Sequence, residues 1–171
     1  GILNDANNEI KVGDRVISFK VIDYDIVEPG NVSDWIYRVE DDGTATIIGY
    51  KGSETKVVIP NYIDGMQVKK IEPPSPRWST IWDSSICLGS SNDPLLWYSP
   101  RQNTITDVTI SEGIEEIGPY TFAASLALKN VSISNTVKSI GESAFTGCSA
   151  MINIRIPTSV IKIDSRAFAK C

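Results

Sequence analysis

Two pairs of closely spaced carboxylates are the first residues in this sequence that could do chemistry. Asp23 and Asp25 are two positions apart, so a β-strand would place both on one face, where they could hold Ca²⁺. Asp41 and Asp42 stand beside Gly43, which is typical of a tight turn. Neither pair has further oxygen ligands close by in the sequence. We therefore interpret all four as solvated surface acids and predict no metal site.

Catalytic and cofactor-binding motifs are missing from the sequence. Histidine, the commonest general base and metal ligand, does not occur among the 171 residues. There is no phosphate-binding glycine loop, nucleophile elbow, HExxH helix or EF-hand spacing. The three cysteines, Cys87, Cys148 and Cys171, are too widely spread for a CxxC-type metal site. We therefore predict no catalytic residue, no cofactor and no enzyme activity.

The last third of the chain instead contains a repeat of 23 residues. Val108, Val131 and Ile154 occupy equivalent positions in three copies that span 105–125, 128–148 and 151–171. Each copy begins with apolar-x-x-apolar-x-apolar, and the final spacing of two is that of a strand. A period of about 20–29 residues with apolar positions in register is typical of a leucine-rich-type solenoid. Neighbouring coils then bury one another's apolar edges.

The second half of each copy carries a turn position followed by a phenylalanine. We interpret the segment after the turn as one or two turns of helix whose phenylalanine points into the coil. The predicted fold is therefore an α/β repeat solenoid, a right-handed coil with a parallel sheet on one face and short helices on the other. The turn residues are Gly118, Gly141 and Asp164, and the phenylalanines are Phe122, Phe145 and Phe168.

Two cysteines close adjacent copies. Cys148 and Cys171 occupy equivalent positions, so stacked coils could bring them within disulfide range. The alternative, which we favour, is two buried free thiols, because free cysteine packs like a small hydrophobic residue.

These copies resemble the BspA-like leucine-rich repeat, whose pattern is roughly L-x-x-I-x-I-P-x-x-V-x-x-I-G-x-x-A-F-x-x-C. The match is closest at Ile156-Pro157, Ala167-Phe168 and Cys171, and residues 57–71 look like an earlier coil that lacks the G-x-x-A-F half. The resemblance implies a bacterial cell-surface or secreted recognition protein that contacts host proteins, matrix or other cells. It also implies a signal segment, which we expect was removed from this chain.

The remaining sequence predicts a cap and an insert. We expect residues 1–50 to form a β-rich N-terminal cap with a hairpin at Asp42-Gly43. Residues 51–171 then form the repeats, interrupted by a Pro/Ser/Trp-rich insert at about 72–103. The insert's aromatic residues either pack back over the sheet, which we favour, or form an exposed binding surface. These aromatics are Trp78, Trp82, Trp97 and Tyr98.

The coil that ends at Cys171 has no such cap in the sequence. Terminal units of a solenoid need a polar or covered outer face. We therefore expect either a contact between chains at this coil or a chain that folds unusually to cover it.

Outward-facing strand positions form the other candidate surface. Either they are a solvated face, which we favour, or they bind a ligand, since solenoid sheets present extended surfaces to partners. The predicted columns are Asp107, Asn130 and Asn153; Thr109, Ser132 and Arg155; and Ser111, Ser134 and Pro157.

Net charge and hydropathy limit which classes of partner the chain is expected to bind. A net charge of −5 disfavours nucleic acid and anionic lipid, and no apolar run approaches the roughly 20 residues of a membrane span. We predict a non-enzymatic adhesion module that binds a protein. The alternative is a glycan-binding or scaffolding component of a bacterial surface complex that uses the tryptophan-rich insert.

Overall fold

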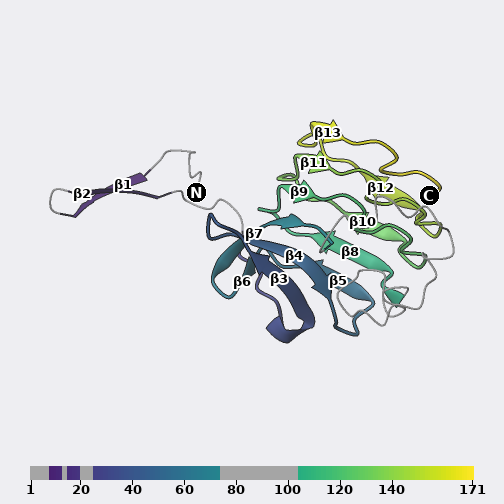
Figure 1. The fold of residues 1–171 in the computed structure, drawn as a ribbon, viewed down its shortest axis with the longest axis horizontal. Coiled ribbons are helices and arrows are strands. Elements are labelled where there is room, and N and C mark those ends of the chain that lie inside the picture. The colour runs from purple at the N-terminus through teal and green to yellow at the C-terminus, as the bar shows by residue number, and fades with distance from the viewer. Residues whose placement is uncertain (1–7, 13–14, 20–24, 74–103) are drawn as a thin grey trace.

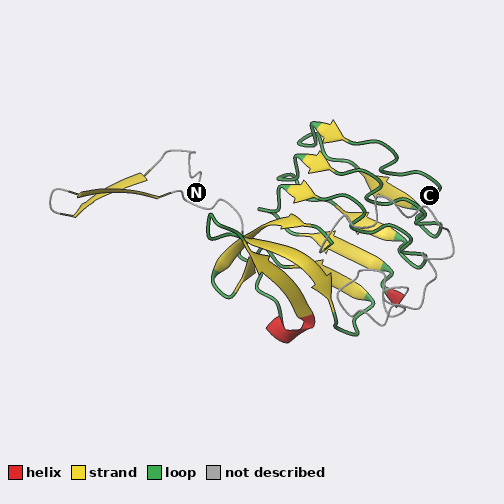
Figure 2. Cartoon of the chain, viewed as in Figure 1, coloured by secondary structure: helices red, strands yellow, loops and turns green. Residues whose placement is uncertain are grey.

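Strands account for most of the regular structure of this chain. The computed structural model describes residues 8–12, 15–19, 25–73 and 104–171. Within these ranges there is no α-helix, and η1 (Val32–Asp34) is a short 3-10 helix (Figure 2). At the N-terminus, β1 (Asn8–Val12) and β2 (Arg15–Phe19) pair antiparallel in a two-stranded sheet of their own.

Four stacked coils build the body of the molecule (Figure 1). Coil 1 is residues 56–71, and coils 2, 3 and 4 are residues 105–125, 128–148 and 151–171. Each coil gives one strand to a parallel first sheet, in the order β12-β10-β8-β5. These strands are β5 (Lys56–Ile59), β8 (Asp107–Ile110), β10 (Asn130–Ser132) and β12 (Asn153–Arg155).

Each coil also gives one strand to a second parallel sheet. Its order is β13-β11-β9-β7-β4-β3, and only β3 against β4 is antiparallel. β6 (Tyr62–Ile63) pairs antiparallel with β7 outside this order. The strands are β3 (Trp35–Val39), β4 (Ala45–Tyr50), β7 (Met66–Ile71), β9 (Glu116–Ile117), β11 (Ser139–Ile140) and β13 (Lys162–Ile163).

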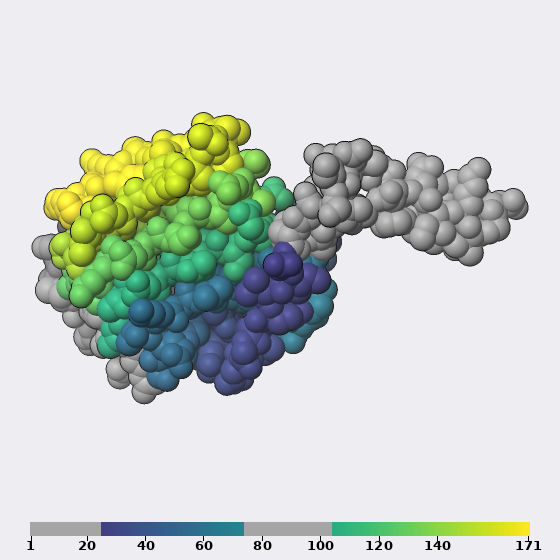
Figure 3. Space-filling view, turned by 180° about the vertical axis from the view of Figure 1, so that it is seen from behind, coloured from purple at the N-terminus to yellow at the C-terminus, as the bar shows by residue number. Residues whose placement is uncertain are grey.

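The repeat register is the one that the sequence predicts. Val57, Val108, Val131 and Ile154 are aligned across the first sheet, and the first three are buried. The coils appear as successive bands in the space-filling view (Figure 3). A period of 23 residues therefore places equivalent side chains directly over one another and produces continuous apolar columns.

The phenylalanines form one of these columns. Phe122 and Phe145 have ring centroids 5.2 Å apart, and Phe145 and Phe168 have centroids 5.3 Å apart with planes at 3°. Phe145, between the other two, is 0% exposed. The predicted stacked core is thus confirmed.

The short helices that the sequence predicts are not formed. The segments 119–124, 142–147 and 165–170 are turns, each with left-handed residues four apart, such as Tyr120 (φ 58°) and Ala124 (φ 57°). Alternate amides in the first of these turns donate to the next coil: Tyr120 to Glu142 O, Phe122 to Ala144 O and Ala124 to Thr146 O. Because these amides bond between coils, they cannot make the i→i−4 bonds of a helix.

The second parallel sheet was also absent from the prediction. Its strands from coils 2 to 4 are two residues long, too short to show the alternation that identifies a strand. They carry the buried Ile117 and Ile140, which the sequence indicates only as apolar positions. A sheet, not a row of helices, therefore forms the second face of the coils.

The segment before coil 1 extends the second sheet. β3 and β4 form a hairpin around Asp42 and Gly43, and Gly43 has the positive φ (79°) that such turns favour. β4 lies parallel to β7, so the hairpin occupies that edge of coil 1. The buried side chain of Asn61 fixes the position of the segment around Val27, which precedes β3, because Asn61 Oδ1 accepts a hydrogen bond from Val27 N at 2.7 Å.

Candidate functional site

The exposed face of the first sheet carries two columns of side chains, which we call the strip. The pairing places Lys56, Asp107, Asn130 and Asn153 in one column. The second column consists of Val58, Thr109, Ser132 and Arg155. The six positions that the sequence predicts in β8, β10 and β12 are thus brought side by side. Lys56 and Val58 are additions, although their place in the first coil could have been deduced from Val57 and Ile59.

The first column contains a hydrogen-bonded carboxylate. Asp107 accepts from Thr106 Oγ1 at 2.6 Å and from Asn130 Nδ2 at 2.8 Å. These two bonds, the Thr106 hydroxyl first, hold the pKa of the Asp107 carboxyl below its usual value. The group therefore stays ionised at neutral pH with its oxygens oriented by neighbours.

The second column has short side chains on β5, β8 and β10. Thr109 and Ser132 are exposed, and Val58 is 52% exposed even though it is apolar. Arg155 lies at the β12 end of this column and is also exposed. Among the described residues, the centre of the strip carries short side chains, so on this part of the chain an approaching surface can come close to the strands.

Two members of the third predicted column, Ser111 and Ser134, are buried, and the third, Pro157, is half-buried. Ser111 is 7% exposed and donates to Ile59 O at 2.6 Å, and Ser134 is buried within 3.1 Å of Thr136 Oγ1. Ser111 comes directly after β8, and Ser134 comes two residues after the end of β10, where the chain turns into the rest of the coil. Their hydroxyls serve internal hydrogen bonds, and the strip contains two columns instead of three.

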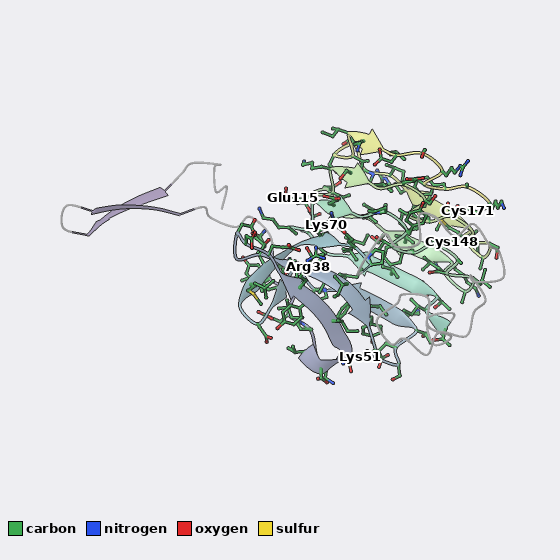
Figure 4. All side chains as sticks on the ribbon, viewed as in Figure 1. Arg38, Lys51, Lys70, Glu115, Cys148 and Cys171 are labelled. Carbon is green, nitrogen blue, oxygen red and sulfur yellow. The ribbon has the colours of Figure 1, made fainter. Side chains whose placement is uncertain are left out.

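A polar cleft on the second sheet, where the hairpin meets coils 1 and 2, is the second candidate site. It has a volume of about 320 Å³, and Arg38, Lys70 and Glu115 are among its lining residues (Figure 4). Lys70 Nζ lies 2.9 Å from Glu116 Oε1 and also pairs with Glu72. Burial acts to lower the pKa of Lys70, but the bonds to Glu72 and Glu116 outweigh it, so the pKa is raised.

The three cations that line this cleft are all paired with carboxylates. Arg38 pairs with Glu40 at 2.8 Å, and Lys69 lies 3.6 Å from Glu115. A ligand would have to displace these partners, which makes the cleft a weaker candidate than the strip. This cleft was not predicted from the sequence, where its signal is the charged pairs Lys69-Lys70 and Glu115-Glu116 at equivalent positions of successive coils.

The two cysteines of the repeats are free thiols, as favoured from the sequence. Cys148 Sγ donates to Phe122 O and Cys171 Sγ donates to Phe145 O, both at 3.1 Å. Burial, with a smaller contribution from Cys171, raises the pKa of Cys148 to about 12. Cys148 is buried as expected, whereas Cys171 is exposed, because it lies on coil 4. Both are structural groups, since each bonds to the phenylalanine of the preceding coil.

Several sequence-based candidates lie outside the described residues. These are the insert residues Trp78, Trp82, Trp97, Tyr98 and Cys87, so the glycan hypothesis that depends on them stays a prediction. Within the described ranges, no cluster of three or more acidic or thiol side chains could hold a metal ion. No helix in those same ranges has the length and apolar character to cross a membrane.

Comparison with known proteins gives the same architecture. A family model described as a BspA type leucine rich repeat region matches residues 99–171. A leucine rich cell surface protein from Faecalibacterium prausnitzii is 31% identical, with a TM-score of 0.57 over 81% of this chain and 33% of that one. A leucine-rich repeat protein from Bacteroides capillosus is 26% identical, with a TM-score of 0.58 over 78% of this chain and 86% of that one.

A leucine-rich repeat protein from Bacteroides ovatus shares the fold at 22% identity, with a TM-score of 0.57 over 81% of this chain and 32% of that one. The chain thus spans about one third of the Faecalibacterium prausnitzii and Bacteroides ovatus proteins. A search of curated proteins gives no match. The register of the coils, the phenylalanine column and the family match agree, and the repeats within residues 99–171 belong to the BspA-type leucine-rich repeat family.

Proposed function

We propose that this chain is a non-enzymatic recognition module that binds a protein partner through the strip. The observation that carries the proposal is the register of the first sheet, which aligns eight side chains from four strands on one exposed face. Leucine-rich repeats are typically interaction modules, and extended sheets are the surfaces that solenoids offer to partners.

The composition of the strip favours a protein ligand. Its side chains offer donors, acceptors and both charges within a flat area, with Lys56 and Arg155 at opposite ends and Asp107 between them. The exposed Val58 adds an apolar contact. Flat interfaces of mixed polarity are typical of protein–protein recognition, whereas small molecules prefer concave, mainly apolar sites.

The same proposal includes location and architecture. We place the chain at the cell surface or among secreted proteins, because the Faecalibacterium prausnitzii relative is described as a cell surface protein. We further propose a right-handed coil and an N-terminal cap within residues 1–50. The pairing of β4 with the edge of β7 supports the cap, because terminal units of a solenoid must cover an open apolar edge.

Two pairs of tryptophan substitutions in the same coils test the strip. Thr109→Trp with Ser132→Trp fills the second column. Glu115→Trp with Lys138→Trp is the matched control in the same coils, because both residues are also exposed, lie directly before β9 and β11, and test the weaker candidate, the polar cleft, which Glu115 lines. Binding of each variant to immobilised matrix and mucus proteins is measured beside the unmodified chain.

We expect the strip variant to lose about tenfold in affinity or more, because bulky rings hold the partner away from the strands. The control should bind as well as the unmodified chain. If both variants bind equally well, the strip is not the recognition surface.

A further inference from the structure

The two sheets differ in how their cations are paired. Two cations lie within the strands of the first sheet, Lys56 and Arg155, and Lys129 stands directly before β10. Within the described ranges, no ion pair includes any of these three. By contrast, all the cations within the strands of the second sheet lie in ion pairs: Arg38, Lys69, Lys70 and Lys162. Of the two sheets, the first therefore has cations that can pair with a partner.

The carboxylates near these cations are held by uncharged donors of the chain itself. The two oxygens of Asp107 accept from Thr106 Oγ1 and Asn130 Nδ2. Glu112, in the turn after β8, accepts from the backbone N of Asn135 at 3.1 Å. Both acids are thus oriented without the help of a lysine or arginine, and the cations of the first sheet keep their charge for an incoming group.

Lys56 and Lys129 lie near Asp107 without pairing with it. Hydrogen bonds from Thr106 and Asn130 are the main causes of the lowered pKa of Asp107, and the charges of the two lysines make smaller contributions. In the described part of the chain, neither lysine comes within ion-pair distance of this carboxylate. The strip and Lys129 together carry three cations and one carboxylate, a net charge of +2, although the whole chain has a net charge of −5. The face of the first sheet should therefore attract negative charge locally.

The spacing of the strands sets the length of a segment that could reach both ends of the strip. Lys56 on β5 and Arg155 on β12 are three strand spacings apart, which corresponds to roughly 15 Å. An extended chain covers this distance in about four or five residues. Residues four apart in an extended chain point to the same face. Between the two cations, the segment would pass over the short side chains of Thr109 and Ser132.

We propose that the strip binds a short, extended, acidic segment of its protein partner, whose carboxylates, about four residues apart, pair with Lys56 and Arg155. This inference rests on the proposed function, because it names the partner chemistry of the same surface. Lys129 adds attraction near the centre, and a hydroxyl or amide of the segment donates to Asp107. The segment is short because the net charge of −5 of the whole chain repels a long polyanion such as a nucleic acid.

A displayed library of random peptides is the probe, because it offers acidic and non-acidic segments alike. Peptides selected on the unmodified chain are sequenced, synthesised with a fluorescent label and titrated with each variant. The strip-charge variant is Lys56→Gln with Arg155→Gln. The matched control is Lys138→Gln with Lys170→Gln, which removes the same charge from exposed positions outside the strip.

We expect the selected peptides to be enriched in Asp and Glu about four residues apart. The strip-charge variant should bind them about tenfold more weakly, because it loses two ion pairs, and the control should bind as tightly as the unmodified chain. Salt should weaken binding to the unmodified chain more than to the strip-charge variant, because screening acts on the pairs that this variant lacks. Loss of binding in the Thr109→Trp, Ser132→Trp variant would locate the peptides on the strip. An unchanged thermal midpoint shows that each variant is folded.

Several results would overturn the inference. One is a selection that gives no peptides or peptides without acidic enrichment, and another is equal binding of acidic peptides to both charge variants. A third is a heparin fragment that binds through Lys56 and Arg155 in place of any peptide, because the occupant would then be a sulfated glycan.

Failure of this inference can be distinguished from failure of the proposed function. If the Thr109→Trp, Ser132→Trp variant loses binding to matrix or mucus proteins while the strip-charge variant binds them fully, the strip remains the recognition surface. In that case only the acidic character of the partner segment is wrong.

Discussion

Coils 3 and 4 have nearly the same sequence pattern and very different surroundings. Coil 3 lies between two neighbours, and its Ile140, Phe145 and Cys148 are completely buried. At the equivalent positions of coil 4, Ile163 and Cys171 are exposed and Phe168 is half-buried. A comparison of the two coils therefore distinguishes the effect of the repeat sequence on burial from the effect of a neighbouring coil.

The difference shows that, in this stack of coils, a side chain is buried by the neighbouring coils and not by its own coil alone. A phenylalanine at the repeat position is directed into the column in both coils, as the parallel rings of Phe145 and Phe168 show. Removal of the ring from water requires a ring above as well as below. Equal sequence positions should thus make unequal contributions to the free energy of unfolding.

The largest expected effect is at the phenylalanine column. Phe145→Ala should lower the free energy of unfolding by roughly 3–5 kcal/mol, because it empties a site enclosed between two rings. Phe168→Ala should cost only about 1–2 kcal/mol, because that ring is already partly hydrated. Urea denaturation of both variants measures the two values.

A matched pair of leucine substitutions serves as the control, because leucine keeps most of the apolar volume. Phe145→Leu and Phe168→Leu should each cost much less than the corresponding alanine variant. Equal losses for Phe145→Ala and Phe168→Ala would contradict the view that stacking, not sequence position, determines burial.

The stacking of coils could be predicted from sequence because it depends on periodicity alone. The 23-residue spacing of Val108, Val131 and Ile154 fixes which residues lie over one another. The same spacing located six of the eight strip residues. Columns of this kind can be predicted from the register of the repeats alone, without knowing the conformation of the turns or loops.

The turns of the repeat could not be predicted in the same way. A segment such as 142–147 contains alanine and phenylalanine, which are compatible with a short helix. Its conformation is decided by hydrogen bonds to another coil, such as Phe145 N to Ala167 O at 2.8 Å. Since those partners are 22 residues away, local propensity cannot reveal them. The burial of Ser111 and Ser134 was missed for a related reason, because the end of each strand is set by the turn.

A smaller loss in the free energy of unfolding is expected at a position where coils 3 and 4 differ in sequence. Gly141 of coil 3 is replaced by Asp164 in coil 4. A Cβ atom on Gly141 would lie 2.5 Å from Pro119 N and 2.6 Å from Gly118 C, both backbone atoms of coil 2. Gly141→Ala should therefore cost about 1–3 kcal/mol in denaturation experiments.

A substitution at the equivalent position of coil 4, Asp164, should leave the free energy of unfolding almost unchanged. Asp164→Ala removes an exposed ion pair with Lys162, at 3.1 Å, which is worth at most about 1 kcal/mol. A Gly141→Ala protein as stable as the unmodified chain would show that coils 2 and 3 can move apart easily. In that case close stacking would not be the property that distinguishes the two coils.

The cysteines should differ in reactivity rather than in stability. Burial raises the pKa of Cys148 to about 12, so almost none of it is thiolate at pH 8, whereas Cys171 is exposed. A maleimide reagent followed by peptide mass spectrometry should label Cys171 at least about tenfold faster than Cys148. Because the folded pKa of Cys148 is raised, its contribution to stability is lost as the pH rises above the unfolded value towards 12. Equal labelling of both thiols would mean that coil 4 opens readily.

The smallest expected effect concerns the strip and can be resolved by NMR. Asn130 of coil 3 donates to Asp107, and after the Thr106 hydroxyl it is the second cause of the lowered pKa of that carboxyl. Asn130→Ala should therefore raise the pKa of Asp107 part of the way to its ordinary value, and Asn153→Ala in coil 4 should leave it unchanged. A lowered folded pKa stabilises the protein above the unfolded pKa, and this contribution is lost as the pH falls through the folded pKa. The Asn130 variant should therefore lose less stability on acidification than the Asn153 variant. If both variants shift Asp107 equally, the carboxylate responds to the whole strip, and the contrast between coil 3 and coil 4 does not extend to the exposed face.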